Sequence, residues 1–346
     1  MKRPPPYVIR RFVIAPLFVL GSVLALGAMP VWIIVAAFVS RFVPGRWRIL
    51  RDAWFLYLYL ALEALMLVLL GAMWIGSGFG WKLRSPGSVD RHYRLAAWWL
   101  RRVMGSARRT FRLQIDQQNP ADRDRPDRPL LVFSRHAGPG DSFLLVDAVL
   151  NRAGRRPRIV LKDVLQLDPV VDVLLNRLPN RFVPSTGRAG EAVVDSIREL
   201  AGSMHSGDAI VLFPEGGNFT PRRRERSIEK LDEIGRPGLA ERARAMQHLL
   251  PPKPAGALAA IDAAPTADVA FVGHTGLEQL STLRDLWRGI PMDAAVTSRI
   301  WIVDAEDIPP TDEREIWLYD RWQTIDDWIT ASADLTSADD PERPTR

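Results

Sequence analysis

A histidine and an aspartate five positions apart are the clearest candidates for chemistry in this sequence. His136 and Asp141 lie in the loop Ser134–Asp141, directly after the apolar run Leu130–Phe133. A histidine acts as a general base near neutral pH when one ring nitrogen is open to a substrate and a carboxylate binds the other. The turn Gly138–Gly140 can fold the aspartate back under the ring. Because loops without a function also carry His and Asp, the pair alone does not decide the chemistry.

A second loop with functional character follows another apolar run. Phe213-Pro214-Glu215-Gly216-Gly217 stands at the end of the run Ala209–Phe213. Proline ends strand pairing, and glycines let backbone amides approach a bound anion closely. By composition alone, however, this segment is a strand followed by a turn.

Apolar runs and helical patterns alternate after residue 129. Five runs bounded by charges, Pro or Gly are predicted as buried strands: Leu130–Phe133, Ile159–Leu161, Ala209–Phe213, Val269–Val272 and Ile300–Val303. Four segments have helical spacing: Ser142–Arg152, Asp163–Arg177, Arg188–Met204 and Ser227–Leu250. This alternation predicts an α/β sheet covered by helices. Catalytic groups in such sheets stand just past the carboxyl ends of strands, where both loops are found. His274 has a comparable place after Val269–Val272, although a lone histidine is weak support for a site.

The first 85 residues have the composition of membrane helices. Phe12–Ser40 contains no Asp, Glu, Lys or Arg, and Ala53–Trp81 contains only Glu63. Each stretch exceeds the about 20 apolar residues that cross a bilayer, and two long segments do not fit a cleaved signal peptide. Arginines before, between and after the two stretches give conflicting topology signals under the positive-inside rule. A break of the first stretch near Pro16, Gly27 or Pro30 into a hairpin would relieve that conflict.

Four parts of the chain follow from these patterns. Residues 1–85 are expected to form the membrane helices, 86–128 an interfacial amphipathic helix and a linker, 129–330 the catalytic domain and 331–346 a disordered tail. Within the second part, Val89–Met104 interleaves tryptophans with arginines, as helices at anionic membrane interfaces do. A helix that faces a protein core and exposes its charges would have the same period.

Composition excludes several classes of site. The chain has no cysteine, so it has no disulfide, no thiol nucleophile and no thiolate metal site. The five histidines are too dispersed to suggest a metal cluster, and we expect no metal. The net charge of +6 indicates a surface that attracts anions, without choosing among nucleic acid, phosphorylated metabolites and lipid headgroups.

Taken together, the two loops resemble the glycerolipid acyltransferase family. Its signatures are a His followed by an Asp with four residues between them, and a Phe-Pro-Glu-Gly motif downstream. The resemblance covers roughly Pro129–Trp328 and is strongest to the lysophospholipid, or 1-acylglycerol-3-phosphate, acyltransferases. It implies a mixed sheet flanked by helices, with membrane helices before it. Two departures stand out: Arg135 precedes His136 where many relatives have Asn, and Gly217-Asn218 replaces the common Thr-Arg.

The resemblance and the residue chemistry together assign roles. His136, oriented by Asp141, would deprotonate an acceptor hydroxyl that attacks an acyl thioester directly, without an acyl-enzyme. The donor would be acyl-CoA or an acyl carrier protein thioester, with no other cofactor. Candidates for binding the acceptor and its phosphate are Arg188, Glu215, Gly216, Lys162 and Lys253, with Arg181 a rival for Arg188. Glu215 has bracing of the loop as an equal alternative. Candidate oxyanion donors are the amides of Gly138, Gly140 and Gly217.

The expected function is transfer of a fatty acyl group to a lysophospholipid, most simply 1-acylglycerol 3-phosphate to give phosphatidic acid. The alternatives are acylation of another lysophospholipid, a glycolipid or glycerol 3-phosphate, and a non-catalytic protein that binds anionic lipid. Nucleic acid is disfavoured by the apolar segments and by the lack of a recognition module. We expect a cell-membrane protein whose active site faces the cytoplasm; the sequence does not disclose its oligomeric state.

Overall fold

The computed structural model describes residues 4–118, 125–138, 140–184, 190–277, 287 and 295–338. The chain divides into two compact units. The first unit comprises Met1–Gln114, Phe143–Ser196 and Trp287–Ala294, and the second comprises Ile115–Ser142, Ile197–Leu286 and Ala295–Arg346. Each unit is described by itself below.

The second unit contains a mixed sheet with the strand order β1-β7-β6-β2-β5. Its centre is β2 (Leu130–Ser134), which pairs in parallel with β5 (Asp208–Leu212) on one side and with β6 (Asp268–Thr275) on the other. The strand β7 (Ala295–Val303) runs antiparallel to β6, and β1 (Gln114–Gln118) is the edge strand beyond it. Every residue of β2 and β5 is buried, which explains why these strands are continuous apolar runs instead of alternating ones.

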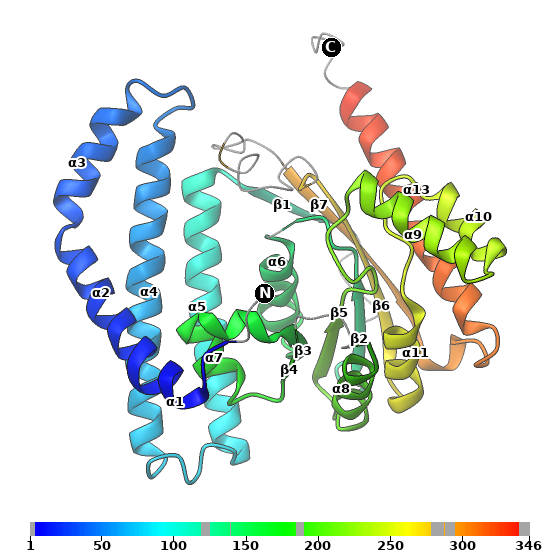
Figure 1. Cartoon of the computed structure of the whole chain (residues 1–346), viewed down its shortest axis with the longest axis horizontal. Helices are drawn as coiled ribbons and strands as arrows, with labels where there is room; N and C mark the ends of the chain where they lie inside the picture. The colour runs from blue at the N-terminus through cyan, green and yellow to red at the C-terminus, as the bar shows by residue number, and fades with distance from the viewer. Residues whose placement is uncertain are drawn as a thin grey trace. The chain divides into compact units, whose positions relative to one another are not determined.

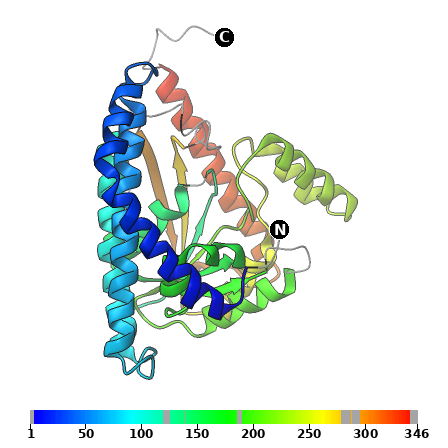
Figure 2. The same ribbon diagram turned by 60° about the vertical axis from the view of Figure 1, so that its left-hand side comes forward.

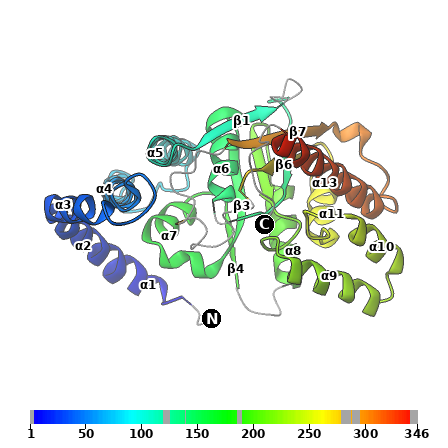
Figure 3. The same ribbon diagram turned by 90° about the horizontal axis from the view of Figure 1, so that it is seen from above.

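Helices of the second unit pack on this sheet. The long helix α13 (Arg314–Ala338) lies along β6, as Figure 3 shows, and α11 (Pro254–Ala263) packs against α13 and β2. Aromatic rings fill the space between β6 and α13. The ring of Phe271 on β6 lies 5.4 Å from that of Trp317, and Trp322 is fully buried beside them. The strands whose ends carry the two motif loops therefore belong to a sheet that packs against α13 through a rigid core.

A helical hairpin in the second unit corrects one prediction. The segment Ser227–Leu250 is not one helix, because α9 (Pro221–Glu233) ends before Gly235 and α10 (Pro237–Ala245) begins after it. Gly235 has a φ of 72°, a left-handed conformation that glycine adopts without strain and that ends a helix. The following Pro237 is suited to the first turn of the next helix.

The first unit is built on two antiparallel helices, α4 (Arg48–Gly76) and α5 (Pro86–Phe111), which lie side by side in Figures 1 and 2. The short helix α7 (Pro169–Leu175) completes their core, which includes Met66, Leu70, Trp99 and Val173. The same unit holds α6 (Asp141–Asp147) from Phe143 onward, the π-helical η2 (Ala148–Arg152), and η3 (Asp163–Leu167) before α7. Its strands β3 (Arg156–Lys162) and β4 (Arg181–Val183) pair in parallel, and α8 (Gly190–Gly202) begins in this unit.

The apolar N-terminal segment is helical almost throughout. It consists of α1 (Tyr7–Ile9), η1 (Arg10–Ile14), α2 (Ala15–Gly27) and α3 (Met29–Ser40). The helix is interrupted at Ala28, two residues before Pro30. Figures 1 and 2 both show α2 leading into α3 without a reversal, so the hairpin considered above does not form. Two helices, Tyr7–Gly27 and Arg48–Gly76, are long and apolar enough to cross a membrane by length and composition.

The structure differs from the sequence predictions in three further respects. The helix predicted at a membrane interface uses its apolar side, including Trp99 and Leu100, to pack in the core of the first unit. This is the core-facing alternative, which the helical period could not exclude. The part 86–128, expected to contain only a helix and a linker, also includes the strand β1 (Gln114–Gln118). The predicted disordered tail begins as helix, since α13 continues to Ala338; residues 339–346 lie outside the described part.

The close approach of α13 to the sheet gives a test of this packing. A Cβ atom added to Gly273 on β6 would lie 2.9 Å from Ile325 and 3.2 Å from the rings of Trp301 and Trp328. We predict that Gly273→Ala lowers the free energy of unfolding by about 1–3 kcal/mol, the usual cost of overpacking a core. Denaturant unfolding measures the change.

The matched control is Gly238→Ala in α10, where an added Cβ meets nothing within 4 Å. That substitution should leave the protein unchanged or slightly more stable, because alanine favours helix over glycine. Equal stability of the Gly273→Ala variant and the parent protein would contradict the packing described here.

Candidate active site

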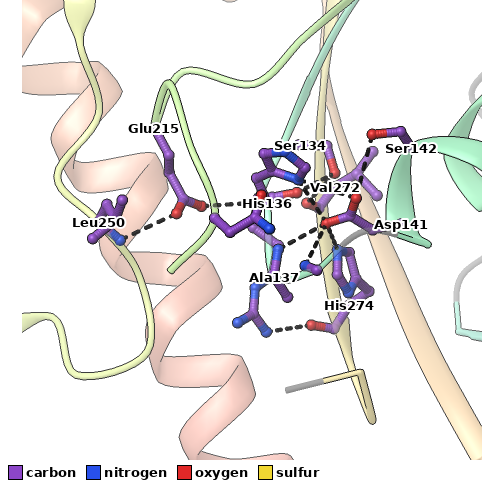
Figure 4. A network of polar contacts seen from close by, with 12 residues as sticks. Ser134, His136, Ala137, Asp141, Ser142, Glu215, Leu250, Val272 and His274 are labelled. Carbon is purple, nitrogen blue, oxygen red and sulfur yellow. Dashed lines mark hydrogen bonds and ion pairs between the residues drawn. The ribbon is translucent and has the colours of Figure 1, made fainter. Parts of the chain in front are cut away.

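Three neighbouring strands of the second unit end at the same edge of the sheet with polar residues. His136 follows β2, Glu215 follows β5, and His274 lies near the end of β6. Because β2 pairs in parallel with both β5 and β6, the carboxyl ends of all three strands meet there. Segments that are about 60 to 80 residues apart in the sequence thus form one cluster, which Figure 4 shows from close by.

The imidazole of His136 and the carboxylate of Asp141 are hydrogen-bonded. Nδ1 of His136 lies 2.9 Å from Oδ2 and 3.0 Å from Oδ1 of Asp141. An ionised carboxylate only accepts hydrogen bonds, so Nδ1 carries the proton and Nε2 is the nitrogen with a free lone pair. The predicted pairing of these two side chains is therefore present in the structure (Figure 4).

Asp141 is held in place by the loop it belongs to. Its Oδ2 accepts the backbone amides of Ala137 at 2.7 Å and of Gly138 at 3.1 Å, and its Oδ1 accepts the hydroxyl of Ser142 at 3.3 Å. Burial by itself would raise the pKa of this carboxyl, but the hydrogen bond and charge of His136, together with His274 and the Gly138 amide, lower the pKa below its ordinary value. The carboxylate therefore stays ionised and available to orient the ring.

The ring of His136 is fixed from a second side by Phe213. The two ring centroids are 4.6 Å apart and the planes are inclined by 32°. The carbonyl oxygen of His136 accepts the amide of Phe219 at 2.9 Å, which joins the two motif loops. The His136 side chain keeps 22% of its surface exposed, whereas Asp141 keeps 2%. A buried orienting group beside a partly open base is the arrangement that general-base catalysis requires.

Glu215 braces the loops and is not placed to bind an acceptor. It is buried, and its two carboxylate oxygens accept the backbone amides of His136 at 3.1 Å and of Leu250 at 3.3 Å, as Figure 4 shows. The sequence had left acceptor binding and bracing as equal alternatives, and the geometry corrects the acceptor assignment. Burial raises the pKa of Glu215 to about 8, although the charge of Arg135 and the hydrogen bonds from the two amides lower it.

Arg135 links the end of β6 to the segment around His248. This arginine is fully buried, and its guanidinium donates to the carbonyl oxygens of His274 at 2.5 Å and of His248 at 3.2 Å. Asp326 on α13 holds the same segment by accepting the amides of Gln247 and His248 at 2.8 and 2.7 Å. The Nε2 atom of His274 lies 3.8 Å from Oδ2 of Asp141. A second imidazole thus stands close to the orienting carboxylate.

Cationic side chains lie at the glycine turn of the second loop. Gly216 has a φ of 69°, and a Cβ added there would lie 2.7 Å from Nζ of Lys253. The backbone of Lys253 is held by the carbonyl oxygen of Pro214 at 2.8 Å. Beside Gly217, the guanidinium of Arg223 donates to the carbonyl oxygen of Asn218 at 3.0 Å. Two cationic side chains therefore lie beside this turn.

The other predicted residues have different outcomes. The amide of Gly138 donates to Asp141, which removes it from the expected oxyanion donors. Gly140 is exposed, and the oxyanion role of its amide and of the Gly217 amide stays a prediction. Lys162 ends β3 in the first unit with an exposed side chain, and Arg188 lies outside the described residues. Among the residues that the structure describes, no group of three or more His, Asp or Glu side chains could hold a metal ion.

Four contributing residues were not assigned a role from the sequence. Arg135 had been noted only as a departure from the family pattern, and its position before His136 was the one signal available. Phe213 packs against the ring of His136, and Arg223 donates to the turn at Asn218. Asp326 accepts the amide of Gln247, which is more than 70 residues away in the sequence. Nothing in a pattern of residue types reveals such partners.

Comparisons with known proteins give a family match and a similar solved structure. Residues 112–271 match the family model described as Acyltransferase. Among solved structures, the chain is similar to the 1-acyl-sn-glycerophosphate (LPA) acyltransferase PlsC from Thermotoga maritima, at 14% identity and a TM-score of 0.41, over 81% of this chain and 98% of that one. No curated protein sequence matches the chain.

The buried carboxyl of Glu215 predicts a pH dependence of stability. Its pKa rises from 4.5 to about 8 on folding, so its contribution is fully present below the lower value and is lost as the pH rises through the higher one. Over this interval the free energy of unfolding should fall with rising pH, by up to about 1.4 kcal/mol per pH unit from this group. In Glu215→Gln this part of the slope should disappear, as followed by denaturant unfolding at a series of pH values.

The control for this measurement is Glu225→Gln, which changes an exposed carboxyl on α9 and should keep the slope of the parent protein. Below pH 4.5, where the parent carboxyl is protonated in both states, Glu215→Gln should be less stable than the parent protein, because its amide group places a donor against a backbone N–H; leaving one such amide unsatisfied costs about 1–3 kcal/mol. An unchanged pH slope in Glu215→Gln would show that this carboxyl is not the titrating group.

Proposed function

We propose, from the match of residues 112–271 to the Acyltransferase family model and from the geometry of the site, that the protein transfers a fatty acyl group from an acyl thioester to the free hydroxyl of a lysophospholipid. The acceptor we propose is 1-acylglycerol 3-phosphate, which would give phosphatidic acid. The observation that carries the proposal is the hydrogen bond between His136 and Asp141 at the sheet edge that also carries the Phe-Pro-Glu-Gly turn.

The reaction follows from the state of the imidazole. Nε2 of His136 removes the proton of the acceptor hydroxyl, while Asp141 keeps the proton on Nδ1 and stabilises the imidazolium that forms. The acceptor oxygen forms a bond to the carbonyl carbon of the thioester. When the tetrahedral intermediate collapses, the carbon–sulfur bond breaks and the leaving thiolate takes the proton from the imidazolium. The chain has no cysteine and no Gly-x-Ser-x-Gly elbow, which favours this direct transfer over an acyl-enzyme.

The acceptor phosphate is assigned to the glycine turn. Lys253 lies over Gly216, and Arg223 supports the neighbouring Gly217 and Asn218. Because Gly217-Asn218 replaces the usual Thr-Arg, these two side chains supply the positive charge that the turn itself lacks. Acyl-CoA and acyl carrier protein thioesters are both compatible donors, since the proposed chemistry involves only the thioester group.

We place the protein in the cell membrane with its active site on the cytoplasmic side. Two helices have the length and apolar composition of membrane spans. Most of the large apolar side chains that are exposed in the described residues lie between Tyr7 and Trp81. An apolar surface of that extent is unfavourable in water and suits a lipid environment, where a lysophospholipid acceptor is also found.

The first test removes the base and its orienting group. We predict that His136→Ala and Asp141→Asn each lower the rate of acyl transfer by about a thousandfold or more, as loss of a general base or of its orienting carboxylate does elsewhere. Transfer is measured with purified protein, an acyl thioester and a panel of lysolipids, with far-UV circular dichroism confirming that the variants are folded.

The matched control is His205→Ala, which removes another histidine of the second unit whose side chain is 81% exposed. This variant should transfer at the normal rate. If His136→Ala retains a near-normal rate, the catalytic assignment is wrong and a lipid-binding role without catalysis becomes the better reading.

The second test addresses the acceptor phosphate. We predict that Lys253→Ala raises the KM for 1-acylglycerol 3-phosphate by about tenfold, the usual size of a lost charge-assisted hydrogen bond, with little change in kcat. For a monoacylglycerol, which has no phosphate, KM should stay unchanged. Lys230→Ala on the exposed side of α9 serves as the control. An equal rise of KM for both acceptors would argue against phosphate binding by Lys253.

A further inference from the structure

The first unit has a strongly basic end that the transfer reaction does not use. The end of α5 meets the beginning of α4, because the guanidinium of Arg51 on α4 donates to the carbonyl oxygen of Thr110 on α5 at 2.7 Å. The segments 41–57 and 105–113, which form this end, contain seven arginines and a single acidic residue, Asp52. A concentration of one charge attracts anions to the surface that carries it.

A shallow cavity of about 320 Å³ opens at this end. It is lined by Leu50, Arg51, Trp54, Arg109 and Thr110. The described hydrogen bonds use two donors of Arg51, one to the carbonyl oxygen of Thr110 and one to that of Arg46. These bonds fix the guanidinium at the cavity, and a guanidinium has five N–H donors in all.

The second arginine of the cavity has no partner among the described residues. Arg109 is exposed in the last turn of α5, whereas its neighbour Arg108 lies 3.8 Å from the carboxylate of Asp147. Arg51 and Arg109 together therefore offer several N–H donors to one small space. A group with several anionic oxygens, such as a phosphate, matches this donor set better than a single carboxylate does.

The surroundings of the cavity identify the carrier of the phosphate. Three of the four charged residues of α4 lie in its first five positions, and only Glu63 follows. Trp54 marks the change from charged to apolar helix and is 42% exposed; Phe42, Trp47 and Leu56 are exposed in the same segment. Tryptophans and arginines at the end of an apolar helix are typical of the headgroup layer of a membrane. A free phosphate has no apolar part that could pack against these side chains.

The basic residues before α2 differ from Arg51 and Arg109 because a carboxylate of the first unit pairs with them. Arg10 and Arg11 lie 3.1 and 3.0 Å from the buried carboxylate of Asp172 on α7. Their charge is thus compensated within the first unit. The donors of Arg51 and Arg109 at the cavity are therefore the ones that we consider for an external anion.

We propose that the cavity formed by Leu50, Arg51, Trp54, Arg109 and Thr110 binds the phosphate of an anionic phospholipid headgroup. Arg51 and Arg109 hold the phosphate oxygens, and Trp54 packs against the glycerol and upper acyl chain. The site is separate from the acyl acceptor site and requires no transfer reaction. It would fix the end of the α4–α5 pair at a membrane surface rich in anionic lipid.

The test measures lipid retention by the full-length protein. Purified protein in neutral detergent is offered equal amounts of dioleoylphosphatidylglycerol and dioleoylphosphatidylcholine, and bound lipid is counted by native mass spectrometry. We expect preferential retention of phosphatidylglycerol, and at least a fivefold loss of that retention in Arg109→Gln. The matched control is Arg94→Gln, which removes the same charge from an exposed position of the same helix and should retain lipid like the parent protein.

Several results would overturn the proposal. Equal retention of the two lipids by the parent protein would show that there is no headgroup preference. Equal losses of retention in Arg109→Gln and Arg94→Gln would show that retention depends only on the net charge of the protein. Displacement of the lipid by millimolar inorganic phosphate would show that a free phosphate suffices. A second variant, Trp54→Ala, should lower retention of phosphatidylglycerol without any change of charge, and unaltered retention there would exclude the assigned orientation.

This experiment is independent of the proposed reaction. Arg109→Gln should transfer acyl groups at the normal rate when donor and acceptor are supplied in mixed micelles. If the parent protein showed no transfer at all, the lipid retention would still be measurable. Failure of the headgroup site and failure of the catalytic proposal are therefore distinguishable.

Discussion

The candidate site depends on one buried carboxylate that is kept charged. Asp141 is nearly inaccessible to water, and a carboxylate in such a place is costly unless hydrogen bonds compensate for the lost hydration. The loop between His136 and Asp141 provides this compensation itself, with the amides of Ala137 and Gly138 and the ring of His136 converging on the two oxygens. The conformation of the loop and the tautomer of the histidine are thereby determined by the same interaction.

The rest of the second unit serves to hold that loop in position. Parallel pairing of β2 with β5 and β6 brings three strand ends to one edge, and Glu215 joins two of the loops by accepting backbone amides from each. Behind them, Arg135 and Asp326 satisfy the carbonyl and amide groups of the segment around His248. These buried charges each bind backbone groups, so they restrain the path of the chain more than they restrain another side chain.

The two units divide the chemistry between them. The described acid–base groups and the glycine turn belong to the second unit, whereas the first unit exposes apolar helices and a basic end with a cavity. An enzyme that takes a lysolipid from a membrane needs both properties, because its acceptor stays partly in lipid while its hydroxyl reacts. The proposed headgroup site adds a fixed contact with anionic lipid that is distinct from the reacting acceptor.

The sequence by itself determined the features that depend on local pattern. The buried parallel strands were predictable because both of their faces are apolar, and the pairing of His136 with Asp141 was predictable because a five-residue spacing with glycines closes on itself. The sequence did not reveal that Ser227–Leu250 is broken, since the helical period continues across Gly235. It also could not choose whether the apolar side of α5 faces a membrane interface or a protein core. Only the tertiary structure decided that Glu215 braces the loop, that Gly138 serves the carboxylate, and that Arg135 and Asp326 support the site. These roles depend on contacts between segments far apart in the chain, and the spacing of residue types carries no information about such contacts.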